Sequence, residues 1–252
     1  MAGIGDIFEM TFFDFVIQSL DVSRANAIEV DKTMKSIDPD VLICCAGTSE
    51  AKLFEDHTLS DFTHLIDLNF YGTLLPIQAV VRNMKKQKRG RIAVVSSVAG
   101  QLGVFGFSAY SSSKFALNGL CQVLSSELRP HGIGVTISFP PDMDTPGYQE
   151  EMKRDKPWEC HEISKTAGLL KPEPIAAKLW ADILAGNYLS VAGMDAWASS
   201  MIANGWNPQT SFSSMIIEMI LAPVFKLVAW GHLKYFEYIV EKGIVRRNKI
   251  KG

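Results

Sequence analysis

The sequence predicts an α/β protein built around a doubly wound parallel sheet. Short apolar segments with strand character alternate with longer segments of helical pattern, and this alternation is typical of parallel strands joined by crossover helices. The length of 252 residues suits one such domain, and 47% hydrophobic residues are enough for a sizeable core. A net charge of −2 argues against nucleic-acid binding, which usually requires a basic excess.

Four segments are expected to form the strands because they are short, apolar and bounded by turn residues. They are 40–45, 91–97, 133–139 and 188–192. Ligands of such sheets bind beyond the carboxyl ends of the strands. The residues at the carboxyl ends of three of these strands, Ala46-Gly47, Ser97 and Pro140, are therefore expected to meet at one edge.

Helices are expected between these strands, and their ends carry the residues that usually stop helices. Gly90 follows the second helix, Pro130 and Gly132 follow the third, and Gly186 follows the fourth. The expected spans are 60–70, 71–88, 110–128 and 172–186. The long segment 147–172 is expected to be a loop, either a cover over the substrate or a solvated excursion.

Proton-transfer chemistry is indicated by Tyr110 and Lys114, with Ser97 thirteen residues upstream of the tyrosine. Residues four apart share one face of a helix, so the lysine charge is expected to lower the pKa of the phenol. Ser97 ends a strand, and its hydroxyl and the phenol are expected to meet over one substrate oxygen. The spacing by itself is equally compatible with an exposed polar pair.

The order of these motifs resembles that of the short-chain dehydrogenase/reductase superfamily. The residues that carry the resemblance are Cys45-Ala46-Gly47, Asn69, Ser97 and Tyr110-x-x-x-Lys114, and it extends over about 20–192. It implies a Rossmann-like fold and an NAD(P)-dependent oxidoreductase that acts on a CH–OH group. More narrowly, segments 100–107 and 140–147 resemble the family of 3-ketodihydrosphingosine (3-dehydrosphinganine) reductases.

The resemblance implies a role for each catalytic candidate. Tyr110 is the general acid for carbonyl reduction, and Lys114 lowers its pKa and holds the nicotinamide ribose. Ser97 polarises the substrate oxygen. Asn69 either holds a water that links Lys114 to solvent or is a helix-interior asparagine bonded to backbone.

The resemblance also implies NADPH as cofactor, held along the same edge. Gly47 lets the cofactor approach the backbone because glycine has no Cβ. Asp21 either contacts the adenine or caps a helix. The full set of expected cofactor contacts is Asp21, Ala46, Gly47, Tyr110, Lys114, Pro140, Met143 and Thr145.

The N-terminal part of the chain departs from the family pattern. The family opens with a strand and a Gly-rich turn that holds the pyrophosphate, whereas only fifteen residues separate Gly5 from Asp21. The first βαβ unit is therefore expected to be mostly missing, with 6–19 helical or irregular, and cofactor binding to be weakened unless the chain is incomplete. In addition, Cys44-Cys45 replaces the usual Asn-Asn.

The four cysteines lack metal-ligand spacing, as do the histidines, so no metal site is expected. Cys44, Cys45, Cys121 and Cys160 are expected to be reduced, buried thiols of a domain that faces the cytosol. No basic segment followed by an apolar one opens the chain, so a secretory signal is not expected.

The C-terminal part, 193–252, is expected to be a separate apolar helical region after a domain at 1–192. Its apolar segment 215–230 is interrupted by Glu218, Pro223 and Lys226. It is either a buried helical hairpin or dimer surface, or a membrane-embedded or interfacial segment. Seven Lys/Arg against two Glu from Lys226 onward, and flanking aromatic residues, favour the membrane alternative.

The expected function is the NADPH-dependent reduction of a long-chain keto-sphingoid, 3-ketodihydrosphingosine, to dihydrosphingosine in sphingolipid synthesis. The resemblance places it at the endoplasmic reticulum membrane with the catalytic domain facing the cytosol, and suggests a homodimer by analogy. The alternatives are reduction of another lipid carbonyl, such as a steroid or retinoid, and a non-catalytic truncated form.

Overall fold

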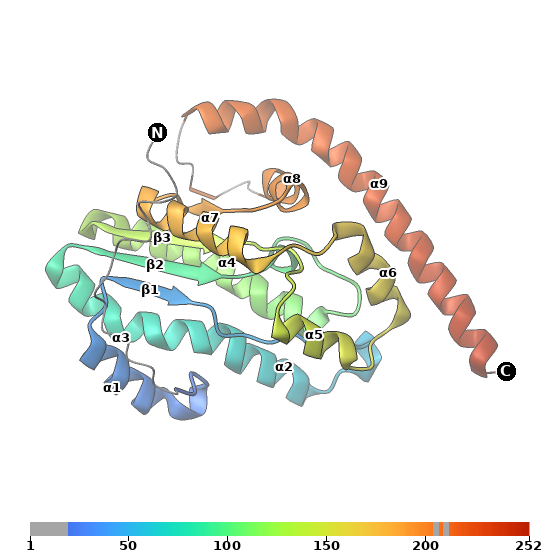
Figure 1. The fold of residues 1–252 in the computed structure, drawn as a ribbon, viewed down its shortest axis with the longest axis horizontal. Helices are drawn as coiled ribbons and strands as arrows, with labels where there is room; N and C mark the ends of the chain where they lie inside the picture. Colours follow the sequence, from blue (N-terminus) through green and yellow to red (C-terminus); the bar gives the residue numbers. More distant parts are fainter. Residues whose placement is uncertain (1–19, 204–206, 209–211, 252) are drawn as a thin grey trace.

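The structure, a computed structural model, describes residues 20–203, 207–208 and 212–251. At its centre lies a parallel sheet, which in this part of the chain has four strands in the order β1-β2-β3-β4 (Figure 1). The strands are β1 (Val41–Cys44), β2 (Gly90–Val95), β3 (Ile133–Ser138) and β4 (Leu189–Ser190). Each lies within or close to a segment that the apolar pattern predicts, so the predicted α/β class is confirmed. Segment 6–19 and the glycines before it lie outside the described residues.

Helices cover both faces of the sheet, as a doubly wound fold requires (Figure 1). Helices α3 (Gly72–Gln87) and α4 (Ser108–Leu128) cover one face, and α7 (Pro172–Ala185) covers the other. Alternation along β2 serves both layers: Ile92 and Val94 pack toward α3 and α4, and Ala93 packs toward α7.

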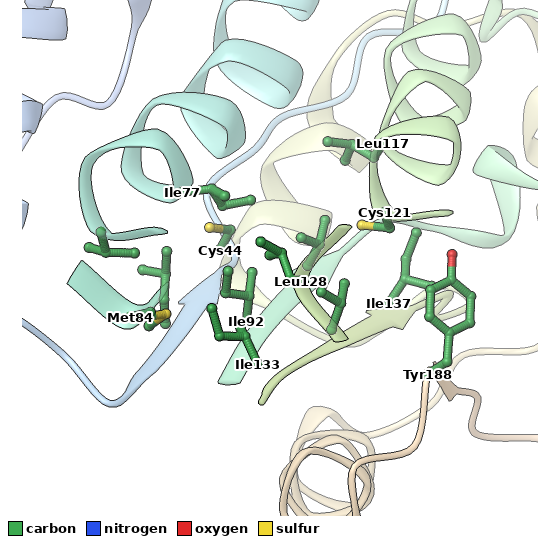
Figure 2. Packing of buried hydrophobic residues seen from close by; sticks show 14 of the residues in the cluster. Cys44, Ile77, Met84, Ile92, Leu117, Cys121, Leu128, Ile133, Ile137 and Tyr188 are labelled. Atoms are coloured by element: carbon green, nitrogen blue, oxygen red, sulfur yellow. The ribbon is translucent and has the colours of Figure 1, made fainter. Parts of the chain in front are cut away.

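The larger core cluster lies between the sheet and the α3/α4 layer (Figure 2). It contains two of the cysteines, Cys44 and Cys121, which fill space as small apolar side chains. Cys160 is also buried, whereas Cys45 is exposed, so the prediction of four buried thiols is wrong for Cys45. Cys45 follows β1 directly and its side chain points away from the core that holds Cys44.

The segment between Thr58 and Gln87 forms a continuous helical rod with an irregular centre. Helix α2 (Leu59–Leu65) begins with a capping box between Thr58 and Asp61. A π-helical stretch, Ile66–Tyr71, then leads into α3. Such wide turns often occur at functional sites, and this one carries Asn69.

Several helices differ from the sequence prediction. Helix α1 (Ala27–Ile37), which packs on α3, was not predicted. The segment expected to be a long loop contains α5 (Pro146–Lys153) and α6 (Trp158–Ala167). The remaining described helices are α8 (Met194–Ala203), α9 (Phe212–Lys251), and the short turns Arg24–Asn26, Phe54–Asp56, Val98–Gly100 and Arg129–His131.

The C-terminal helix α9 is continuous through Pro223, so the alternative of a helical hairpin is wrong. Figure 1 shows it running along the outside of the domain, past α8 and α6, both of which it contacts. Arg247 of α9 donates a hydrogen bond to the buried carboxylate of Glu159 on α6. The proposed division of the chain at residue 192 remains a prediction.

Close packing of the short turn Val98–Gly100 onto α4 leaves no room for a side chain at Gly100. A Cβ there would overlap Ser96 Oγ and lie 2.9 Å from the backbone oxygen of Lys114. The turn that follows Ser97 is thereby held against the helix that carries Tyr110 and Lys114.

We predict that Gly100→Ala lowers the free energy of unfolding by about 1–3 kcal/mol, because the added methyl overpacks this contact. Gly119→Ala is the matched control, since a Cβ at Gly119 on α4 meets nothing within 4 Å. It should raise the free energy of unfolding by about 0.5–1 kcal/mol through helix propensity. Urea unfolding measures both; equal effects of the two substitutions would contradict the packing argument.

Candidate active site

Tyr110 and Ser97 meet at the carboxyl end of β2, as the sequence predicts. Tyr110 lies in the first turn of α4, and Ser97 caps the turn Val98–Gly100, its hydroxyl accepting a hydrogen bond from Ala99 N at 3.1 Å. The side chain of Ser97 acts on the phenol of Tyr110 and lowers its pKa, so the two groups lie close together. One substrate oxygen placed at this pair would contact both hydroxyl groups.

Lys114 lies one helical turn beyond Tyr110 and is buried, with 5% of its surface exposed. Its Nζ donates a hydrogen bond to the carbonyl of Val95, the last residue of β2, at 3.0 Å. Nζ also lies 5.8 Å from the centre of the Tyr110 ring. Burial lowers the pKa of Lys114 from its ordinary 10.5 to about 8.

The pKa of Tyr110 shifts in the direction opposite to the one expected from the sequence. Burial raises it from 10.0 to about 12, and the influence of the Ser97 side chain opposes this only in part. The negative charges of Glu151 and Asp142 raise it further. Without cofactor the phenol is therefore protonated at neutral pH, which is the form that a proton donor needs.

Asn69 is fully buried, and its side chain joins the loop after β1 to α4. Its Nδ2 donates to Thr48 O at 3.0 Å and to Ser113 Oγ at 2.9 Å, and its Oδ1 accepts from Thr48 N at 2.9 Å. The bonds to Thr48 are backbone contacts, as expected for the second role, that of a helix-interior asparagine bonded to backbone. The role of holding a water stays a prediction.

Gly47 lies between Asn69 and Lys114. A Cβ on Gly47 would lie 2.9 Å from Asn69 Oδ1 and 3.4 Å from Lys114 Nζ. Only glycine fits this approach without a shift. Beside it, the thiol of Cys44 donates a weak hydrogen bond to Thr73 O at 3.8 Å, in place of the amide that the family carries.

The segment after β3 is hydrogen-bonded to the turn that follows Ser97. Val98 N donates to Pro140 O at 3.1 Å, which ties the two strand ends together. Met143 forms a β-bridge with Leu170, and the hydroxyl of Thr145 caps α5 by accepting from Tyr148 N at 3.2 Å. Pro140 thus lies beside the Ser97 turn, while cofactor contacts by these three residues remain predictions.

The carboxylate of Asp21 is engaged by its own segment. It accepts hydrogen bonds from Ser23 N at 2.9 Å and Asn26 Nδ2 at 2.6 Å, and the Ser23 bonds hold its pKa below the usual range. Asp21 therefore caps a local turn, which is close to the helix-capping role that the sequence left open. Contact with an adenine remains a prediction.

Two serines that the sequence analysis did not single out hold the site together. Ser96 Oγ donates to the backbone oxygen of Lys114 at 3.1 Å, and Ser113 Oγ donates to that of Tyr110 at 2.7 Å. Both are buried. The only signal in the sequence was their position next to Ser97 and inside Tyr110-Ser-Ser-Ser-Lys114.

The arrangement fits a nicotinamide dinucleotide in two respects. The described residues give Lys114 Nζ one acceptor, Val95 O, so the ammonium keeps N–H groups for the hydroxyls of a ribose. Gly47 keeps the approach to that ammonium free of a side chain. In the part of the chain that the structure describes, no cluster of His, Cys, Asp and Glu has the arrangement of a metal site.

The buried ammonium of Lys114 should make stability depend on pH. The folded state holds this proton less tightly than the unfolded chain, so burial of Lys114 lowers stability below about pH 8, and the penalty disappears as the pH rises toward about 10.5. Relative to Lys114→Met, which fills the same space without a charge, wild-type protein should gain free energy of unfolding from about pH 7 to about pH 10. Urea unfolding of both proteins measures the difference; a difference that does not change with pH would refute the shift.

The comparisons with known proteins agree with this geometry. The family profile described as short chain dehydrogenase matches residues 7–156. The 3-ketodihydrosphingosine reductase of Mus musculus is 40% identical over 235 residues, which cover 92% of this chain and 70% of the relative. The 3-dehydrosphinganine reductase of Danio rerio is 38% identical over 233 residues, with the same two shares.

Solved structures show the same fold. The structure described as ElxO with NADP bound matches with a TM-score of 0.61 at 22% identity, over 70% of this chain and 75% of that one. A short-chain dehydrogenase from Streptomyces avermitilis matches with a TM-score of 0.61 at 25% identity, over 85% and 79%. On the family profile and the similarity to these relatives, the chain belongs to the short-chain dehydrogenase family.

Proposed function

We propose that this chain is an NADPH-dependent reductase that converts the ketone of 3-ketodihydrosphingosine (3-dehydrosphinganine) to the hydroxyl of dihydrosphingosine (sphinganine) in sphingolipid biosynthesis. The observation that carries the proposal is the meeting of Ser97, Tyr110 and Lys114 at one sheet edge. The substrate follows from the names of the relatives from Mus musculus and Danio rerio.

In this mechanism the residues move and hold protons around the ketone oxygen. Tyr110 holds a proton on its phenol oxygen and gives it to the ketone oxygen as negative charge develops there. Ser97 donates a hydrogen bond to the same oxygen and stabilises that charge. Lys114 binds the ribose hydroxyls of the cofactor, and Asn69 holds the loop that contains Gly47. When bound, the cofactor supplies the hydride.

The choice of NADPH over NADH is supported by similar structures whose descriptions name this cofactor. They include ElxO with NADP bound and a Sphingobium yanoikuyae short-chain dehydrogenase in complex with NADPH. The proposed contacts of the cofactor are Asp21, Ala46, Gly47, Tyr110, Lys114, Pro140, Met143 and Thr145.

Membrane association through α9 is part of the proposal. Within it, Met215–Lys249 is long and apolar enough to cross a membrane, and its most apolar part is not buried against the rest of the protein. Its contacts with α8 and α6 favour a helix that lies along the domain and in the membrane interface. We place the protein at the endoplasmic reticulum membrane, facing the cytosol, on the basis of its resemblance to the 3-ketodihydrosphingosine reductases.

The reductase proposal predicts that purified protein oxidises NADPH when 3-ketodihydrosphingosine is added, which the loss of nicotinamide absorbance measures. Tyr110→Phe should lower kcat by about 10²–10⁴, the usual contribution of a positioned acid, with little change in the free energy of unfolding. Tyr235→Phe is the matched control, because this half-exposed tyrosine lies on α9.

Two results would reject this proposal. A Tyr110→Phe variant with a normal rate would show that the proton comes from another group. No NADPH oxidation by wild-type protein, while the Mus musculus relative is active in the same assay, would reject the activity. Titration of NADPH against tryptophan fluorescence then tells whether the chain binds the cofactor without turnover or does not bind it.

The membrane proposal predicts that the protein floats with vesicles that contain anionic phospholipids. Replacing two exposed apolar side chains of α9, Ile220→Glu and Leu227→Glu, should reduce the bound fraction at least several-fold, because charged side chains resist entry into the interface. Ile28→Glu on α1, which replaces a side chain that is 87% exposed, is the control. Equal flotation of all three proteins would contradict a role of α9.

A further inference from the structure

Two carboxylates, those of Asp142 and Glu151, lie within electrostatic reach of the proposed acid. Asp142 follows Pro140, whose carbonyl is bonded to Val98 beside the Ser97 turn. Glu151 lies on α5 and accepts a hydrogen bond from Ser49, in the loop that begins at Gly47. The charges of both carboxylates act on the phenol of Tyr110. These acids therefore border the place where a ketone would bind, although the Tyr-x-x-x-Lys motif contains neither of them.

The charge of Glu151 is largely neutralised within the protein. Lys156 Nζ lies 3.0 Å from Glu151 Oε1, and the lysine side chain is 3% exposed. Such a sheltered pair with good geometry behaves as a nearly neutral unit toward a third group. Glu151 and Lys156 together thus add little net charge to the site.

Asp142 has no such partner. Ser164 donates a hydrogen bond to its Oδ2, whereas the described residues provide no donor to its Oδ1 and no salt bridge to either oxygen. Burial raises the pKa of this carboxyl, as does the charge of Glu151, whereas the hydrogen bond from Ser164 and the charge of Lys156 act in the opposite direction. Asp142, Glu151 and Lys156 together therefore carry one formal net negative charge that acts on the phenol, and Oδ1 of Asp142 has no donor among the described residues.

We infer that Asp142 binds the ammonium group of the substrate and selects an amino ketone over a neutral ketone. The inference rests on the proposed function, since the proposed substrate carries a protonated amine on the carbon next to its ketone. With the ketone oxygen on Ser97 and Tyr110, that ammonium lies one carbon away from the reacting centre. A single positive charge matches the net charge of the three residues, and an ammonium supplies the donors that Oδ1 lacks.

Lys114 does not compete with the substrate ammonium for the Asp142 carboxylate. Lys114 is held under Gly47 by its bond to Val95 O, and no salt bridge connects it to Asp142 in the described chain. A neutral steroid or retinoid ketone would leave the Asp142 carboxylate without a partner at a site partly closed to water, and this is costly. Asp142 thus favours amino ketones partly because its unpaired carboxylate disfavours the binding of neutral ketones.

The test compares binding and turnover of an amine with those of its uncharged derivative. The probes are a short-chain, water-soluble dihydrosphingosine analogue and its N-acetyl derivative, titrated calorimetrically against the full chain with NADPH present. Wild-type protein should bind the amine about 10- to 100-fold more tightly, the range for a hydrogen bond with a charged partner. Asp142→Asn, which keeps an acceptor for Ser164, should remove that preference and leave binding of the N-acetyl derivative unchanged.

The matched control is Glu150→Gln, which removes an acid from the same helix as Glu151 but at a surface pair with Lys153. It should keep the wild-type preference. An Asp142→Asn variant that keeps the preference, or a wild-type protein that shows none, overturns the inference. The proposed function is tested separately: if wild-type protein prefers the amine but reduces neither the amino ketone nor its N-acetyl derivative, the reductase proposal fails and the binding role of Asp142 stands.

Discussion

The hydrogen bond from the Lys114 ammonium to the carbonyl of Val95 is the contact on which the active edge depends. It joins the helix that carries Tyr110 to the end of the strand that precedes Ser97. An ammonium buried in this way is costly, as its lowered pKa shows, and the cost falls when other acceptors approach. This geometry is consistent with the proposed role of Lys114 in binding the ribose hydroxyls of the cofactor. The close fit of Gly47 against the same Nζ follows from this geometry.

A second constraint is the separation of charge across the site. Lys114 is bonded to the last residue of β2, whereas Glu151 lies on α5 and Asp142 in the segment after β3. In this state the acids and burial outweigh any effect of the ammonium, so Tyr110 remains a protonated phenol. That state suits reduction, in which the tyrosine gives up a proton, and it gives an aminated substrate a complementary surface.

The sequence was sufficient to predict the strands, because their residues form short segments with a clear pattern of burial. The strands at 91–97 and 133–139 are mostly buried because helices cover both faces of the sheet. Ser97, Tyr110 and Lys114 followed from their places at strand and helix ends. Helices α5 and α6 were not predicted, because they are short and carry many charged residues with little apolar pattern. The sign of the Tyr110 pKa shift was also out of reach, since it depends on burial and on residues 32 and 41 positions away.

The same limit applies to α9 and to Asn69. A proline usually ends a helix, so the sequence suggested an interruption at Pro223, but a helix exposed to solvent at this point can leave the affected carbonyl accessible and continue. The resemblance named Asn69 as a site residue. Its three bonds to Thr48 and Ser113 depend on a π-helical turn, which the local sequence does not predict.

The central claim is that Ser97, Tyr110 and Lys114 form a site for carbonyl reduction by a nicotinamide cofactor. Its most direct test follows the hydride itself: protein in excess is mixed with 3-ketodihydrosphingosine and NADPH that carries deuterium at the transferred position, and the product is analysed by mass spectrometry. The account predicts dihydrosphingosine with one deuterium on the carbon of the former ketone. Product without deuterium, or deuterated product formed equally well by protein with phenylalanine at position 110, would contradict it.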